Sequence, residues 1–527
     1  MSGGEPTFAA TSGAAGLNLS PTERATESLI VSTRPGRLRE VRTALQRRGA
    51  KIGRTLTIIE SLAVAVAPGH RSAIASLPGV LAVNVDAQLR PLGQPASGGT
   101  PGPLKSDDTN TSGPSNVENR DPGSTESIAR VTGALALWKK GFTGRGVDVA
   151  LIDTGIAPVP GSPESVNGAD LSIDSGTANL RFVDGFGHGT HMAGIIAGHD
   201  PGLVEAHKAN GAFVGIAPGS RIVNVKVGGT DGGVHVSQVV AALDWVVQNR
   251  QANGMNIRVV NLSYGAPATP DWRRDPLAWA AEVAWRRGVL VVSAAGNEGP
   301  GHQLASPAYS PQILAVGATE VENRRGGRRE YLIAPYTSTG DRRRPDLYVP
   351  GSHVISLRVK GSFVDTFLAR SNIDDQLTRG SGTSQATAVT SGLAALLFEA
   401  FPSATPDQIK WLLTATVDPD RSNRDVSGIE TSVDLAEAWK VGRKSLAPIQ
   451  PTDPFVGCEV TWCRGAGEGD PLLVAWARSA WNSTAWTGNQ WTGNQWTGNQ
   501  WTGNQWTGNQ WTGNQWTGNQ WTSTWAP

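Results

Sequence analysis

The stretch GVDVALIDTG, residues 146–155, decides the fold of this chain. Most of it is a continuous apolar run, and it ends abruptly in an aspartate, a threonine and a glycine. A strand that is apolar on both faces is typical of a parallel sheet covered by helices on either side. The stretch therefore predicts a buried strand that ends at Asp153, followed by a tight turn that Gly155 permits.

Further apolar runs of the same kind follow, and amphipathic segments separate them. The predicted strands are RIVNVKV (221–227), RVVNLSYG (258–265), GVLVVSAAGN (288–297) and QILAVGA (312–318). The predicted helices are HGTHMAGIIAG (188–198), VSQVVAALDWVVQNR (236–250) and PLAWAAEVAWRRG (276–288). This alternation predicts an α/β domain over residues 126–442, with a parallel sheet and helices on both faces. Active sites in such sheets gather at the carboxyl ends of the strands.

Ahead of this domain, residues 27–91 predict a small α+β unit. The order of the predicted elements is β-α-β-β-α-β, a split βαβ arrangement, and ESLIVSTR (27–34) is its first strand. Residues 1–26 are predicted to be disordered. Residues 92–125 are rich in Pro, Gly, Ser and Asn, which predicts a flexible linker.

Charge and composition exclude several classes of protein. The chain has 527 residues, with 46 Lys and Arg against 45 Asp and Glu, and such a balance argues against a nucleic-acid partner. We expect no membrane span, because no apolar run reaches about 18 residues. No secretory signal is visible at the start. The two cysteines, Cys458 and Cys463, form either a local disulfide or two unpaired thiols.

Three polar residues stand at the edges of predicted elements. Asp153 ends a strand, His188 begins a helix among glycines, and Ser384 opens a long apolar helix in RGSGTSQATAVTSGLAALL (379–397). An aspartate, a histidine and a serine are the parts of a nucleophilic triad, in which the imidazole takes the hydroxyl proton and the carboxylate orients the ring. Each residue alone has a structural explanation, such as a turn or a helix cap.

Taken together, the motifs DTG, HGTHMAG and SGTSQATA resemble the signature segments of the subtilisin-like serine proteases, over about residues 126–442. RPDLYVPG (344–351) is similar to the family's stretch before the serine. The resemblance implies that Asp153, His188 and Ser384 are catalytic and that Asn297, in VVSAAGNEGP, supplies the oxyanion hole. It also implies that the substrate strand pairs with Ser263, Tyr264 and Gly265 on one side and lies near Val227, Gly228 and Gly229 on the other.

The chain departs from the family pattern next to the serine. The family usually has methionine after the nucleophile and proline three residues later, whereas this chain has Gln385 and Ala388. Both lie on the helix behind Ser384, outside the line of proton transfer. His191, one turn beyond His188, is expected to be structural.

By the same resemblance, residues 27–91 are similar to the family's inhibitory propeptide, and the linker would contain the self-cleavage site. A ferredoxin-like accessory domain is the alternative. We identify no cofactor and no metal ligands. Structural calcium is common in the family, but no DxDxDG loop is present to assign it.

The chain ends in a repetitive tail. After a predicted linker over residues 443–475, tryptophans recur every five residues from Trp476 to Trp521, within residues 476–527. A period of five makes no single apolar face on a helix or a strand. Such a tail suits contact with glycans or a cell wall, or it is a repeat without a defined partner.

The sequence thus predicts a serine endopeptidase made as a self-inhibited zymogen, with protein or peptide substrates and its own propeptide as an intramolecular inhibitor. The alternatives are an inactive subtilisin-like scaffold that binds surfaces through its tryptophan tail and an intracellular processing protease of narrow specificity. The resemblance implies an extracellular or cell-surface location, and a cytoplasmic one stays open.

Overall fold

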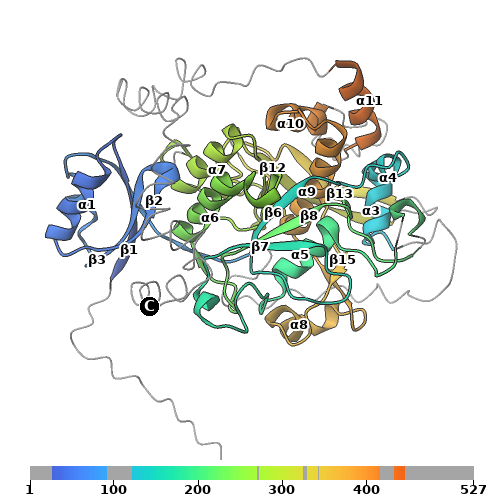
Figure 1. Ribbon diagram of the computed structural model, residues 1–527, viewed down its shortest axis with the longest axis horizontal. Helices are drawn as coiled ribbons and strands as arrows, with labels where there is room; N and C mark the ends of the chain where they lie inside the picture. The colour runs from blue at the N-terminus through green and yellow to red at the C-terminus, as the bar shows by residue number, and fades with distance from the viewer. Residues whose placement is uncertain are drawn as a thin grey trace, which may run out of the picture.

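The computed structural model describes residues 26–91, 121–415 and 433–445, apart from residues 204, 210, 270, 271, 324–328 and 342. Residues predicted to form the disordered N-terminus, most of both linkers and the tryptophan tail lie outside this part, as do both cysteines. The described residues form a small N-terminal unit that packs on a larger α/β domain (Figure 1).

The N-terminal unit is a four-stranded antiparallel sheet in the order β2-β3-β1-β4. Its elements are β1 (Glu27–Thr33), α1 (Leu38–Arg47), β2 (Lys51–Leu56), η1 (Thr57–Ile59), β3 (Ser61–Val66), α2 (Arg71–Ala75) and β4 (Val80–Val85). Alternate side chains of β1 serve two faces. Leu29 and Val31 join the core under α1, whereas Ile30 packs into the core of the larger domain.

The larger domain is built on one extended sheet, in the order β13-β12-β11-β10-β6-β8-β7, with β14 also paired to β12. The strands are β6 (Asp148–Asp153), β7 (Ser165–Asp170), β8 (Arg221–Lys226), β10 (Ile257–Leu262), β11 (Leu290–Ala294), β12 (Leu314–Asn323), β13 (Arg329–Ile333) and β14 (Leu347–Pro350). The pairs are parallel, except that β13 at the edge runs antiparallel to β12. The predicted parallel sheet is therefore confirmed, and its strand order places β6 near the centre.

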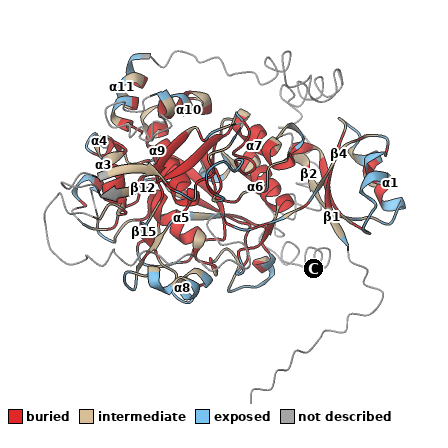
Figure 2. Cartoon of the chain, turned by 180° about the vertical axis from the view of Figure 1, so that it is seen from behind, coloured by how far each residue is buried: buried red, intermediate tan, exposed pale blue. Residues whose placement is uncertain are grey.

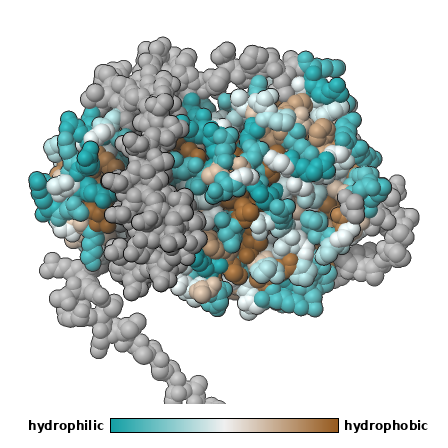
Figure 3. All heavy atoms as spheres, viewed as in Figure 1, coloured by the Kyte–Doolittle hydropathy of each residue, from teal (hydrophilic) through white to brown (hydrophobic). Residues whose placement is uncertain are grey.

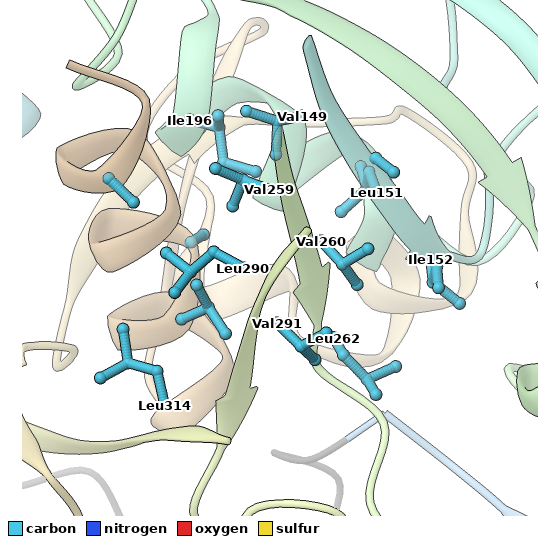
Figure 4. Close-up of a cluster of buried hydrophobic side chains, with 14 of the residues drawn as sticks. Val149, Leu151, Ile152, Ile196, Val259, Val260, Leu262, Leu290, Val291 and Leu314 are labelled. Atoms are coloured by element: carbon cyan, nitrogen blue, oxygen red, sulfur yellow. The ribbon is translucent and has the colours of Figure 1, made fainter. Parts of the chain in front are cut away.

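Helices cover the two faces of this sheet (Figure 1). On one face α5 (His188–Ala197) packs against α9 (Thr383–Ala400), and on the other α6 (Val236–Asn249) packs against α7 (Pro276–Arg286). Figure 4 shows side chains of β6, β10 and β11 meeting Ile196 of α5 in a fully buried cluster. Figure 2 shows the same distribution across the molecule, with buried residues filling the sheet and the inner helix faces.

The remaining elements lie around the edges of the domain. They are α3 (Thr125–Val131), α4 (Ala134–Trp138), α8 (Phe363–Phe367), α10 (Pro406–Ala415), α11 (Leu435–Ser445), the short pair β5 (Gln88–Leu89) and β9 (Val234–His235), and the hairpin β15 (Val354–Leu357) and β16 (Leu377–Gly380). Thus α3 begins one residue inside the predicted linker, and α11 runs three residues past the predicted boundary at 442. Among the described residues, no helix combines the length and apolarity that a membrane crossing requires.

Candidate active site

Asp153 and His188 meet at the carboxyl end of the central strand. Asp153 is the last residue of β6 and is fully buried, and His188 is the first residue of α5. Gly187 precedes the helix with a φ of 102°, a left-handed conformation that favours glycine. The Nδ1 atom of His188 lies 2.8 Å from Oδ1 of Asp153. Nε2 of His188 is buried and has no hydrogen-bond partner among the described residues, so it is available to another group.

A second aspartate, Asp184, organises the turn that presents His188. Its buried carboxylate accepts hydrogen bonds from the backbone N–H groups of Phe186, Gly187 and Thr190 and from the hydroxyls of Thr154 and Thr190. Thr154 in turn accepts a bond from the N–H of Gly189, at 2.8 Å. This network joins the end of β6 to the start of α5. Sequence reasoning missed Asp184, although its place four residues before His188 was visible.

Ser384 is the second residue of α9 and is fully buried at the start of that helix. Asn297 lies beside it through the neighbouring residue, Thr383. The amide oxygen of Asn297 accepts bonds from the N–H of Thr383 at 2.9 Å and from its hydroxyl at 3.0 Å. Its Nδ2 is buried and has no partner within the described residues. Thr383 therefore fixes the side chain and leaves the amide donor available, a role that the sequence did not indicate.

Two histidines of α5 have opposite electrostatic surroundings. Burial lowers the pKa of His188, but the charge and hydrogen bond of Asp153 outweigh burial and raise it above the ordinary value. Burial and the nearby His188 lower the pKa of His191 to about 3. His191 therefore stays neutral under ordinary conditions, whereas His188 can hold a proton that Asp153 stabilises.

The side chains of His191 and Gln385 both lie against the face of Gly380, the last residue of β16, from which a Cβ would project. A Cβ at Gly380 would collide with both Nε2 of His191 and Nε2 of Gln385. Gln385 directly follows Ser384, and His191 is one turn from His188, so this contact brings the starts of α5 and α9 together. Gln385 itself belongs to the first turn of α9 and is buried, with 6% of its surface exposed.

The end of the N-terminal unit pairs with two segments of the larger domain. In antiparallel pairing, Gln88 is opposite His235 and Leu89 is opposite Val234, and Pro91 bridges to Tyr264. Ser263 and Tyr264 are buried, and the Tyr264 hydroxyl donates to the carbonyl of Gly232 at 3.1 Å. The backbone of the predicted substrate-binding stretch 263–265 thus faces an extended segment.

The other predicted substrate-binding residues are placed differently. Val227, Gly228 and Gly229 are buried, and the N–H groups of Val227 and Gly228 bond to the carbonyl of Asp153. The segment that pairs with residues 88 and 89 is Val234–His235, a few residues further along the same loop. Sequence reasoning missed this pair, because nothing in VGGTDGGVHV marks which part of the loop is extended.

Within the described residues, no group of three or more His, Cys, Asp and Glu side chains is arranged to hold a metal ion. A lysine occupies one buried polar site close to the active-site turn. The fully buried Nζ of Lys226 bonds to Asp174 at 2.9 Å and to the carbonyls of Leu180 and Val183.

Comparison with known proteins places these residues in a family context. The family model described as Subtilase family matches residues 144–435. The chain is 34% identical over 280 residues to serine protease AprX of Bacillus subtilis. The matched region covers 52% of this chain and 61% of AprX. It is 34% identical over 287 residues to subtilisin Savinase of Lederbergia lenta, which is 54% of this chain and 87% of that protein.

Two further similarities are more distant. The minor extracellular protease Epr of Bacillus subtilis is 31% identical over 278 residues, covering 52% of this chain and 35% of Epr. The matched region thus spans less than two thirds of AprX and of Epr. The crystal structure of fervidolysin from Fervidobacterium pennivorans, a keratinolytic enzyme related to subtilisin, superimposes with a TM-score of 0.57 at 22% identity. The superposition covers 80% of this chain and 62% of fervidolysin. At this identity the similarity supports only the assignment of the fold.

Proposed function

Because the chain belongs to the subtilase family, we propose that it is a serine endopeptidase in which Ser384 attacks the scissile carbonyl. The observation that supports this most directly is the pair Asp153 and His188, joined at 2.8 Å at the strand end beside the serine helix. The buried Nε2 of His188, which has no partner among the described residues, is the atom suited to accept the serine proton.

In the proposed reaction, Ser384 Oγ bonds to the carbonyl carbon while its proton passes to His188. Asp153 holds the ring through Nδ1 and stabilises the imidazolium. The pKa of His188 is raised because of this stabilisation. His188 then gives the proton to the leaving amine, which departs from the acyl-enzyme. Water hydrolyses the acyl-enzyme with His188 again as base, and free Ser384 is restored.

Asn297 is proposed to stabilise the oxyanion of the tetrahedral intermediate. Its Nδ2 is the donor, because Thr383 already occupies Oδ1. The N–H groups in the first turn of α9 lie in the same region, where the helix dipole favours negative charge. Donors fixed before the reaction stabilise the transition state more than the ground state.

The N-terminal unit is proposed to act as an intramolecular inhibitor. Residues 88–91 form a strand against Val234–His235 and Tyr264, which is the mode in which a peptide substrate adds to a sheet edge. Asp86, just before this strand, accepts bonds from the N–H and hydroxyl of Ser237 at the start of α6. These contacts support the proposal that the unit covers the positions of the substrate strand, and the linker that follows would contain the processing site.

The first test compares the full chain with Ser384→Ala by intact mass over time and by labelling with a fluorophosphonate. We expect only the wild type to take the label and to lose a fragment that ends within residues 91–125. Labelling without loss of the fragment would keep the enzyme and remove self-processing from the proposal. A folded wild-type chain that does neither would contradict it and favour the inactive scaffold, whose surface contacts would involve the tail.

The proposal extends to location and substrates. A location outside the cell or at its surface agrees with the name of one relative, an extracellular protease. Protein or peptide substrates follow from the strand-pairing mode. We also propose that residues 476–527 contact glycans or a cell wall. These residues lie outside the part of the chain that the structure describes.

A further inference from the structure

A small exposed helix, α8, stands next to the turn that presents His188. Its Phe363 is 38% exposed and its Phe367 is 56% exposed. Among the described residues, six large apolar side chains are exposed, and three of them, Phe363, Phe367 and Ile373, belong to the loop between β15 and β16. Apolar side chains therefore gather near the active-site turn. Figure 3 shows brown, hydrophobic atoms at the surface in the lower central part of this face, among teal and white ones.

The rings of α8 continue a stack that starts inside the domain. Phe186, which is buried, stacks on Phe363 with centroids 5.1 Å apart, and Phe363 stacks on Phe367 at 5.3 Å. The ring planes are tilted by only 9° and 12°. Phe186 is two residues before His188. The exposed rings are thus the outer end of an aromatic column whose inner end supports the catalytic turn.

The loop that carries α8 is held in this shape by polar contacts. The carboxylate of Asp365 accepts bonds from Arg358 at 2.5 Å and from the Gly361 N–H and Asn372 Nδ2 at 2.8 Å each. Ser362 caps the helix by accepting from the N–H of Asp365. The loop is therefore ordered by several hydrogen bonds, and the exposure of Phe363 and Phe367 does not come from poor packing of the loop.

The aromatic column adjoins the loop that pairs with the N-terminal unit, which is the proposed place of the substrate strand. A Cβ at Gly232 would lie 2.7 Å from the Phe186 ring, and Gly232 accepts the hydroxyl of Tyr264. Two residues further on, Val234 pairs with Leu89 of the N-terminal unit. The same loop that flanks the docked strand on one side thus touches the column on the other.

We propose that Phe363 and Phe367 form an aromatic rim that binds aromatic or large aliphatic side chains of a polypeptide substrate, close to the scissile bond. This inference rests on the proposed endopeptidase function. Strand pairing recognises backbone and is indifferent to side chains, so selection requires surfaces of this kind beside the paired strand. Contact with the loop that pairs with the N-terminal unit favours substrate over a second copy of the chain or over its tail.

The test measures kcat/KM for internally quenched peptides of about ten residues in which a single phenylalanine is moved, one position at a time, along both sides of the cleavage point. A tripeptide anilide that ends at the scissile bond is the short substrate. The variant is Phe367→Asn, and its matched control is Trp411→Asn, an exposed aromatic residue of α10. Fluorophosphonate labelling counts active sites in every preparation.

We expect Phe367→Asn to lower kcat/KM by about three- to tenfold for peptides with phenylalanine at one or two particular positions, which is the size of an aromatic pair. The anilide, the peptides with serine at those positions and the Trp411→Asn control should be unchanged. An equal effect on all substrates, or none, would overturn the rim.

If Phe367→Asn instead raised activity on every substrate, and only when residues 476–527 are present, the rim would be covered by the chain's own tail and the proposal would be wrong. A chain that takes no label would overturn the endopeptidase function, and the rim with it. A labelled chain whose specificity ignores Phe367 would overturn the rim alone.

Discussion

At the scale of single residues, we expect Asp184 to determine how well the proposed triad is oriented. Its carboxylate accepts hydrogen bonds from three backbone N–H groups and two hydroxyls. Asp184→Asn would turn an NH2 group toward donors. We expect a loss of about 1–3 kcal/mol in stability, the cost of leaving buried donors unsatisfied, and a lower kcat. Calorimetry at a fixed scan rate and active-site-normalised kinetics measure the two effects.

The control for Asp184 is Asp375→Asn, because the Asp375 side chain is 89% exposed. That substitution removes an exposed ion pair with Lys360, which contributes little to stability. If both variants lost the same stability, or if Asp184→Asn left kcat unchanged, Asp184 would not be the residue that orients the turn.

Some candidate site residues can be recognised from the sequence around them, whereas others depend on contacts with residues far away in the chain. Asp153, His188 and Ser384 could be predicted because each stands at the end of an element and belongs to a short motif. Thr383 could not be assigned, since its function is to hold Asn297, which is 86 residues away in the chain. The extended conformation of Val234 could not be predicted either, because it depends on the segment that lies against it, and that segment contains Leu89.

At the scale of elements, strands with apolar runs were predictable and β7 was not. The sequence SVNGAD (165–170) has few strand-forming residues, and the pairing with β8 determines its conformation. At Gly168, a Cβ would lie 2.7 Å from the Trp245 ring, so close packing with α6 requires a glycine there. The hairpin of β15 and β16, with α8 between its strands, was missed for a similar reason, because it gains its order from side-chain contacts within the loop.

Helix α6 links the two units through a buried carboxyl, and this contact predicts pH dependence. Asp244 of α6 faces the N–H groups of Ile58 and Thr57 in η1 of the N-terminal unit. Burial raises the pKa of Asp244 well above its ordinary value, and those two N–H groups only partly oppose it. Once the N-terminal unit leaves, the carboxyl meets water and its pKa returns toward about 4.

The sign follows from proton uptake. The docked state prefers the protonated carboxyl, so docking is insensitive to pH below about 4 and weakens as pH rises from there to the raised pKa, by up to about tenfold per unit. Asp86 acts in the same direction, because burial raises its pKa against the bonds from Ser237. We therefore expect the N-terminal unit to dissociate more readily as the pH increases.

Hydrogen exchange at Val234 and His235 in the Ser384→Ala chain, recorded across pH and corrected for the intrinsic exchange rate, measures this opening. Asp244→Asn should reduce the slope of the pH dependence to the part that Asp86 contributes, without abolishing docking, because the amide stays neutral. A slope that Asp244→Asn leaves unchanged, or one that disappears only with His235→Gln, would assign the dependence to another group at the interface.

At the scale of the whole molecule, the N-terminal unit and the larger domain form one interface that no local pattern reveals. Ile30, Ile58 and Ala63 of the unit belong to the same buried cluster as the central sheet of the larger domain. In β1, Ile30 alternates with Leu29 and Val31. This alternation predicts only that the strand is apolar on both faces. Which face meets a partner is decided only when α6 and α7 are in place.

Leu89 gives the sharpest test of how this interface closes the cleft. It is 2% exposed and pairs with Val234, whereas the neighbouring Gln88 is exposed. Burial of a leucine side chain is worth about 1.5–3 kcal/mol, so Leu89→Asp should shift the chain toward open forms by at least about tenfold. In a Ser384→Ala background, a fluorescent peptide substrate should then bind correspondingly more tightly, since apparent affinity scales with the open fraction. Gln88→Ser is the matched control and should change binding much less, because the Gln88 side chain is exposed and reaches the larger domain only beside Gly233. Equal peptide affinity in all three chains would mean that residues 88–91 do not block the substrate strand, and the inhibitory role of the N-terminal unit would fail while the triad proposal remained.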